Sequence, residues 1–162
     1  GFAIISEIPW YLLNGADGIH NVMFTLALGV ATLMVLENLL QRSLVLGFLW
    51  TLGMAGLASW LGVDYEWRGI LVIVIFYLFN VYGHSFPYSR GMQFFSTFAL
   101  MIHYGVIGAV MACMILYLYN GKRGFVQGSI AKYGFYAFYP AHFILFIQIC
   151  ERSFPCILMF KL

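Results

Sequence analysis

The sequence carries little charge for its length. Eight basic and six acidic residues are spread over 162 positions, and 63% of the residues are apolar. A soluble domain contains about 45–50% apolar residues, and one of this size buries only about 70% of the surface that its unfolded chain exposes. As a water-soluble globule, this chain would leave many aromatic and aliphatic side chains in water. The composition therefore excludes a soluble domain and predicts an integral membrane protein.

Signatures of several function classes are also missing. The three cysteines, Cys113, Cys150 and Cys156, form no Cys-x-x-Cys pair, so packing explains them better than redox chemistry, and no metal site is expected. The eight basic residues form no stripe, which argues against a nucleic-acid partner. The sequence contains no internal repeat, phosphate-binding loop or dinucleotide fingerprint.

Long uncharged runs are present instead. Five runs without a formal charge contain 19, 21, 21, 31 and 18 residues. Each reaches the length of about 17–25 residues that a helix needs to cross a bilayer, and none alternates with the period of a strand. We therefore expect an all-α, polytopic transmembrane helix bundle with about five full spans and a partial helix from Gly1 to about Leu12. The five expected spans are 20–38, 43–62, 68–83, 93–119 and 132–150.

Both ends of the sequence look cut. The first residue is Gly1, and the segment from Gly1 to Trp10 is already apolar, as in the second half of a helix. At the other end, Phe154 to Leu162 is apolar but too short to cross a bilayer. We expect residues 1–162 to form a single transmembrane domain of a longer chain that has further helices ahead of it.

Polar residues near the first two helices are candidate site residues, because an ionisable group at the bilayer centre costs at least about 2.5–3.5 kcal/mol. Pro9 should break the first helix and leave Glu7 near a membrane face, either among headgroups or as a site carboxylate. Asn21 and Thr25 share a helical face, where they would bond the broken end or face a substrate. His20 lies at the water interface and is expected to be solvated rather than catalytic.

The fourth and fifth spans contain further polar groups. His103 lies at mid-depth in the fourth span, where one neighbour would satisfy a buried imidazole. In the fifth span, Pro140 frees the carbonyl of Tyr136 and should kink the helix beside Tyr139 and His142. A kinked helix with these side chains on adjacent turns is typical of a buried polar site, and a purely structural role explains it equally well.

Two charged turns complete the set of candidates. Asp64 and Arg68 are four residues apart, the spacing of an intrahelical ion pair, although they would also suit a polar ligand. Lys122 and Arg123 follow Asn120 in a glycine-flanked turn. That turn is either a topological anchor or a clamp for phosphate groups.

Four segments, in this order and at these intervals, resemble the TraX family. They are Ser6–Pro9, Asn21–Leu26, Asn120–Gly124 and Phe135–His142. TraX proteins are polytopic membrane proteins linked to bacterial conjugation, and the named member acetylates the N-terminus of pilin. The family looks like a branch of the transmembrane acyltransferases that use acetyl-CoA. The resemblance extends to about residue 150.

The resemblance implies an enzyme of the bacterial cytoplasmic membrane. It would transfer an acetyl group from acetyl-CoA to an amine or hydroxyl of a protein or surface molecule. Its partners would be membrane lipids, acetyl-CoA and the acceptor, and a homo-oligomer is left open. TraX relatives carry an Asp-His pair on a helix ahead of the Ser-Glu-Ile-Pro segment, so the histidine of acyl transfer is expected in a part that precedes this sequence.

The same resemblance, joined to side-chain chemistry, implies roles for individual residues. His142 would relay a proton, Tyr139 would donate a hydrogen bond, and Glu7 would position an acceptor ammonium group. The residues expected at the phosphates of CoA are Lys122, Arg123 and Asn120. The residues expected at the substrate are Asn21, Thr25, Asp64 and Arg68.

A component of an ion- or proton-coupled membrane transporter is the alternative function. In that case the ionisable groups would form a path through the membrane. The path would contain Glu7, Asp64, His103 and His142.

Overall fold

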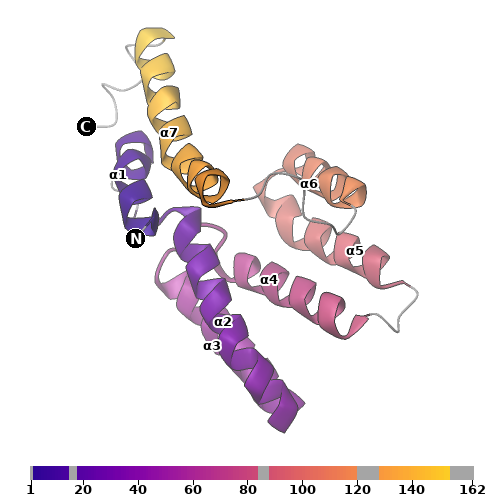
Figure 1. Ribbon diagram of the computed structural model, residues 1–162. Coiled ribbons are helices and arrows are strands. Elements are labelled where there is room, and N and C mark those ends of the chain that lie inside the picture. Colours follow the sequence, from indigo (N-terminus) through magenta and orange to yellow (C-terminus); the bar gives the residue numbers. More distant parts are fainter. Residues whose placement is uncertain (1, 15–17, 84–87, 120–127, 154–162) are drawn as a thin grey trace.

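The computed structural model describes residues 2–14, 18–83, 88–119 and 128–153, and these residues are largely helical (Figure 1). The α-helices are α1 (Phe2–Asn14), α2 (Val22–Arg42), α3 (Leu44–Trp60), α4 (Glu66–Val81), α5 (Ser89–Met101), α6 (Val106–Leu118) and α7 (Ser129–Ser153). A short 3₁₀ helix, η2 (Ile102–Tyr104), lies between α5 and α6. The expected all-α class is confirmed.

The lengths of the helices do not establish five membrane spans. Among the described residues, α2 alone is both long and apolar enough to cross a membrane, while α3 and α6 are apolar but shorter. The single span expected at 93–119 is wrong, because η2 and Gly105 interrupt it. Gly105 has a φ of 123°, a conformation that residues with a side chain rarely adopt, so the helix cannot continue through it. An uncharged run reports hydropathy and does not report helical continuity.

The core of the molecule lies where α2, α3 and α4 pack together (Figure 1). Leu36, Ala58 and Ile70 are almost completely buried there, one from each of the three helices. Close approach of α2 and α3 depends on Gly47, where an added Cβ would lie 2.6 Å from Leu40 Cδ2. Helix α1 packs against α2, and α5 packs against α4, so these three helices connect the elements at the two ends.

Helices α1 and α7 lie side by side at one end of the molecule, and α5 and α6 pair at the other (Figure 1). The rings of Trp10 and Phe143 join α1 to α7 with centroids 5.5 Å apart. Helix α1 runs through Pro9 to Asn14, so the break expected at Pro9 is wrong. Proline removes one helical hydrogen bond, and α1 tolerates the loss because hydrogen bonds to the segment before α2 hold it at Ala3, Glu7 and Trp10.

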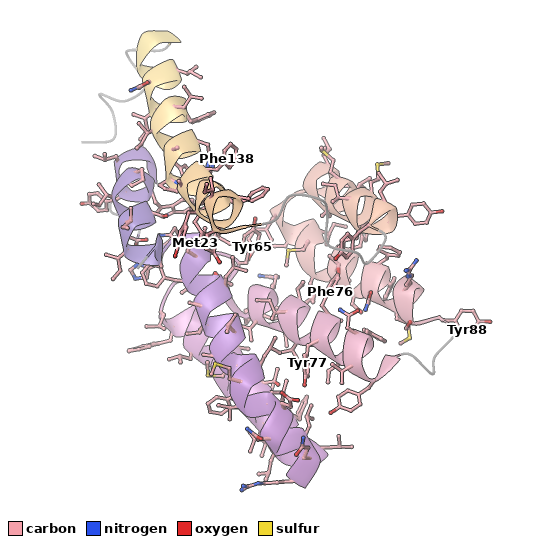
Figure 2. The ribbon with its side chains drawn as sticks, in the orientation of Figure 1. Met23, Tyr65, Phe76, Tyr77, Tyr88 and Phe138 are labelled. Atoms are coloured by element: carbon pink, nitrogen blue, oxygen red, sulfur yellow. The ribbon has the colours of Figure 1, made fainter. Side chains whose placement is uncertain are left out.

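The outer surface carries many large apolar side chains (Figure 2). Trp60, Ile107, Leu118 and Ile130 are among the most exposed. Monomeric soluble proteins rarely expose apolar surface on this scale. This surface, together with the length of α2, indicates that the protein associates with a membrane.

Candidate functional site

Glu7 is the centre of a polar cluster between α1 and the start of α2. Its Oε1 atom accepts a hydrogen bond from His20 Nδ1 at 2.6 Å. Its Oε2 atom accepts from the backbone N–H of Asn21 at 3.3 Å and also from the Asn21 side-chain amide. Both carboxylate oxygens therefore have partners, and a carboxylate makes stronger hydrogen bonds than a neutral acceptor does.

Asn21 holds this cluster together because it is the N-cap of α2. Its Oδ1 atom accepts from the backbone N–H of Met23 at 3.0 Å, which satisfies a donor in the first turn of the helix. Its side-chain amide donates to Glu7 and, at 2.9 Å, to the carbonyl of Ala3. One buried side chain thus caps α2 and bonds it to α1. The sequence predicts that Asn21 bonds a helix end broken at Pro9 or faces a substrate; Asn21 does bond α1, but α1 is unbroken there.

The backbone of His20 is held by two hydrogen bonds to the loop that precedes α4. The N–H of His20 donates to the carbonyl of Gly62, and its carbonyl accepts from the N–H of Asp64, both at 2.8 Å. These two bonds form an isolated parallel bridge between His20 and Val63. Gly62 has a φ of 63°, and an added Cβ would lie 2.6 Å from the carbonyl oxygen of Gly18. Only glycine fits at this turn without displacing the loop that carries His20.

The bond to Glu7 fixes which ring nitrogen of a neutral His20 imidazole carries the hydrogen. A carboxylate accepts hydrogen bonds, so Nδ1 must donate, and in the neutral ring Nε2 then carries the free lone pair. The His20 side chain is 46% exposed and that of Glu7 29% exposed. A histidine oriented by a carboxylate in this way is the arrangement of a general base.

Sequence reasoning correctly placed His20 in an exposed position but missed its pairing with Glu7. The two residues are 13 positions apart, and their contact depends on a reversal of the chain between them. The glycine- and asparagine-containing turn sequence at 14–18 was the available signal, because it predicts such a reversal.

Thr25 and Tyr139 lie against the same first turn of α2. The Thr25 hydroxyl is buried and donates to the carbonyl of Asp64. The hydroxyl of Tyr139, from α7, lies near the backbone N–H of Val22 and close enough to Asp64 and Glu7 to interact with their charges. Figure 2 shows Met23, Tyr65 and Phe138 at this junction, where α2, α4 and α7 meet. The structure thus brings together four of the residues selected from the sequence: Glu7, Asn21, Thr25 and Tyr139.

His142 lies one aromatic ring away from the cluster. Its Nδ1 atom is 3.1 Å from the carbonyl oxygen of Phe138, to which it donates. Its ring stacks on Phe138 and meets the ring of Tyr139 edge-on, with centroids 5.4 Å apart in both pairs. Helix α7 continues without a break across Pro140. His142 therefore reaches the polar cluster through Tyr139.

Asp64 and Arg68 do not form the ion pair that their spacing predicts. Helix α4 begins at Glu66, and Tyr65 and Glu66 have positive φ angles of 63° and 45°, so Asp64 lies outside the helix. Arg68 instead lies 3.7 Å from a carboxylate oxygen of Glu66 and 4.5 Å above the ring of Trp67. The four-residue rule fails here because it applies only within a continuous helix.

Burial changes the acidity of the turn before α4. It raises the pKa of the Asp64 carboxyl, and the hydrogen bond from the backbone N–H of Tyr65, at 3.1 Å, only partly opposes this change. Burial also raises the pKa of the Tyr65 hydroxyl, and the nearby Asp64 charge adds to the effect. Asp64 lies close enough to Tyr139 to interact with it through its charge, whereas Arg68 lies over Trp67 and near Tyr104.

The remaining candidates lie elsewhere. Asn120, Lys122 and Arg123 are outside the described residues. His103 lies in η2, is exposed, and meets the ring of Tyr104 with centroids 5.4 Å apart. Within the described ranges, no group of three or more histidine, cysteine or acidic side chains is placed to hold a metal ion.

Comparison with known proteins gives the chain a family. The model of the family described as TraX protein matches residues 1–150. A curated relative, the probable fimbrial assembly protein FimC of serogroup H1 from Dichelobacter nodosus, is 30% identical over 158 residues. The match covers 86% of this chain and 58% of that relative, so the chain spans little more than half of the relative's length. No solved structure matches. The family match over residues 1–150 means that the chain belongs to the TraX family.

Proposed function

We propose that this chain is part of a membrane-embedded acyltransferase that transfers an acetyl group from acetyl-CoA to an amine or hydroxyl of a pilin-like protein. Membership of the TraX family supports the reaction class, through the resemblance to transmembrane acyltransferases. The name of the relative from Dichelobacter nodosus describes fimbrial assembly by that protein, which supports a pilin-related acceptor for this one.

The observation that carries the proposal is the hydrogen bond between Glu7 and His20. Acetyl transfer needs a base that removes a proton from the attacking amine or hydroxyl. Nε2 of His20 has the free lone pair for this step, and Glu7 stabilises the positive charge that the ring then acquires. The proton taken up by His20 passes to the sulfur of CoA when the carbon–sulfur bond of the thioester breaks.

Tyr139 is suited to stabilise the negative charge that develops on the thioester oxygen. Its hydroxyl lies near the backbone N–H of Val22 and near Glu7, and a phenol O–H is a hydrogen-bond donor. Beside Glu7, the Ser6 hydroxyl is buried and has no hydrogen-bond partner among the described residues. A buried polar group in that state fits a site that takes up a polar ligand.

The other residues selected from the sequence take supporting roles in this proposal. Asn21 and Thr25 have their hydrogen bonds satisfied internally, so they hold the site in place rather than bind substrate. His142 touches Tyr139 by ring contact and bonds Phe138 through Nδ1, so in this proposal it positions Tyr139 and takes no part in proton transfer. Lys122 and Arg123 remain the proposed contacts for the phosphates of CoA. The thioester supplies the acetyl group. The histidine of acyl transfer, expected in the part that precedes this sequence, would lie at the thioester.

The test is acetyl transfer by the full-length protein in lipid vesicles, measured with radiolabelled acetyl-CoA and a peptide that carries a pilin N-terminus. We expect transfer by the wild type, and a rate lower by about 10²–10⁴-fold for His20→Gln and Glu7→Gln. His103→Gln, a histidine outside the cluster, is the matched control and should retain activity.

Two outcomes would contradict the proposal. The first is a wild-type protein that shows no CoA-dependent transfer, which would rule out the acyltransferase reaction; proton flux across the vesicle membrane without CoA would then favour a transporter. The second is normal transfer by His20→Gln, which would rule out His20 as the base while leaving the reaction itself supported.

A further inference from the structure

Two adjoining cavities are lined mainly by residues of α4, α5 and α6, with Leu33 of α2. Figure 1 shows α5 and α6 away from α1, which carries Glu7. The larger has a volume of about 670 Å³ and a mainly apolar lining that includes Ile73 and Ile115. The smaller, of about 290 Å³, contains Arg90 and Gln93. Three residues line both cavities: Phe76, Asn80 and Leu116. The two spaces therefore adjoin one another and form one candidate site, with a more polar part at Arg90 and an apolar part beside Ile73 and Ile115.

The smaller, more polar space is suited to an anion. Arg90 is exposed and forms no ion pair among the described residues, and the side-chain amides of Asn80 and Gln93 lie beside it. Arg90, Gln93 and Thr97 are spaced so that they share one face of α5. At a rise of about 1.5 Å per residue, Thr97 lies roughly 10 Å from Arg90 along the helix, inside the larger cavity.

Thr97 supplies an independent sign of a ligand. Its side chain is 4% exposed, and its hydroxyl has no hydrogen-bond partner within the described part of the chain. The other buried threonines of the helices behave differently: Thr32 donates to the carbonyl of Leu28, and Thr51 to that of Gly47. A buried hydroxyl without a partner is unfavourable unless a bound group accepts its hydrogen bond.

We propose that this site binds an anionic amphiphile. Its phosphate would lie at Arg90, because a guanidinium group matches phosphate in charge and geometry. A carbonyl oxygen further along the molecule would accept the Thr97 hydrogen bond, and an alkyl chain would fill the space beside Ile73 and Ile115. Ester phospholipids and long-chain CoA thioesters share this chemistry. The inference does not depend on acetyl transfer.

Native mass spectrometry of the full-length protein in detergent tests the proposal with three probes. They are dioleoyl phosphatidylglycerol, its diether analogue without carbonyl groups, and palmitoyl-CoA. Arg90→Gln should weaken binding about tenfold, the loss expected for one charge-assisted contact. The wild type should prefer the ester lipid over the diether by about three- to tenfold, and Thr97→Val should remove that preference.

Matched variants separate the site from general effects. Arg42→Gln removes an exposed cation at the end of α2, and Thr51→Val removes a buried hydroxyl whose partner is its own helix. Both should bind all three probes as the wild type does. Whichever of the ester lipid and palmitoyl-CoA binds and is weakened by Arg90→Gln is the source of the ligand.

Three results would overturn the proposal. They are no binding of the ester lipid or of palmitoyl-CoA by the wild type, unchanged binding by Arg90→Gln, and an ester preference that survives in Thr97→Val. The thermal midpoint of Thr97→Val without ligand checks its folding. It should equal or exceed that of the wild type, since the substitution removes an unpaired buried hydroxyl. Acetyl transfer is not measured here, so failure of this site and failure of the proposed reaction remain distinguishable.

Discussion

Nδ1 of His20 lies 2.6 Å from Oε1 of Glu7, and the other oxygen of the same carboxylate is held by Asn21. A single side chain on α1 thus fixes two consecutive residues at the start of α2. The candidate base and the N-cap of the helix depend on the same carboxylate. Substitutions in this cluster should therefore change stability as well as chemistry.

Asn21→Ala should be strongly destabilising. The substitution removes the N-cap of α2 and leaves Glu7 Oε2 and the carbonyl of Ala3 without the side-chain amide that bonds both. The combined loss should be about 2–4 kcal/mol. Thermal unfolding in detergent, followed by circular dichroism, measures it. Asn38→Ala, at an exposed position of α2, is the control, and an equal effect of both changes would contradict the role of Asn21.

Asp64→Asn should stabilise the protein at neutral pH. Because burial raises the pKa of Asp64 above 3.8, the fold favours the protonated carboxyl. The protonated Asp64 carboxyl therefore contributes fully to the free energy of unfolding below about pH 3.8, and this contribution is lost as the pH rises through the folded-state pKa. The variant should unfold at a higher temperature than the wild type near pH 7, by a margin that shrinks in acid.

The check on Asp64 is the unfolding temperature of both proteins across that pH range. Glu37→Gln, an exposed acid on α2, serves as the control and should show no such trend. A difference between wild type and Asp64→Asn that stays constant with pH would contradict the effect of burial.

Gly62→Ala and Gly53→Ala should have opposite effects. At Gly62 the positive φ alone costs a side-chain-bearing residue about 1–2 kcal/mol, and the new Cβ would also approach the Gly18 carbonyl. At Gly53, within α3, an added Cβ meets no atom within 4 Å, so alanine should stabilise the helix by up to about 1 kcal/mol. Equilibrium unfolding in denaturant compares the two. Equal signs would show that the turn at Gly62 is not conformationally demanding.

Gly105→Ala tests the break between α5 and α6. The φ of 123° is strained for alanine, while no atom lies within 4 Å of the added Cβ, so any loss comes from the backbone alone. We expect a loss of about 1–3 kcal/mol in the free energy of unfolding. Gly108→Ala, in open space on α6, should be neutral or stabilising. A gain of stability at Gly105 would mean that the chain prefers a continuous helix there.

Composition and local pattern predicted the helical class and most of the cluster around α2. Asn21 and Thr25 share a face because they belong to one continuous helix, which periodicity identifies. The same reasoning failed at Asp64 and Arg68, because tertiary contacts start α4 two residues later than the spacing requires. It also missed the pairing of Glu7 with His20, since a chain reversal sets that contact, and its signal is the turn sequence at 14–18 rather than any periodicity.

Helix α4 connects the cavity at Arg90 with the loop that binds the backbone of His20. Its last turns line the cavity through Phe76 and Asn80, and the loop ahead of it binds the backbone of His20 through Gly62 and Asp64. About 20 Å of helix separates these ends, at about 1.5 Å per residue. A displacement of α4 by a single residue's rise, directed away from His20, would lengthen the 2.8 Å bonds to as much as about 4.3 Å, past hydrogen-bonding range. The backbone position of His20 therefore depends on a helix whose other end lines the cavity that contains Arg90.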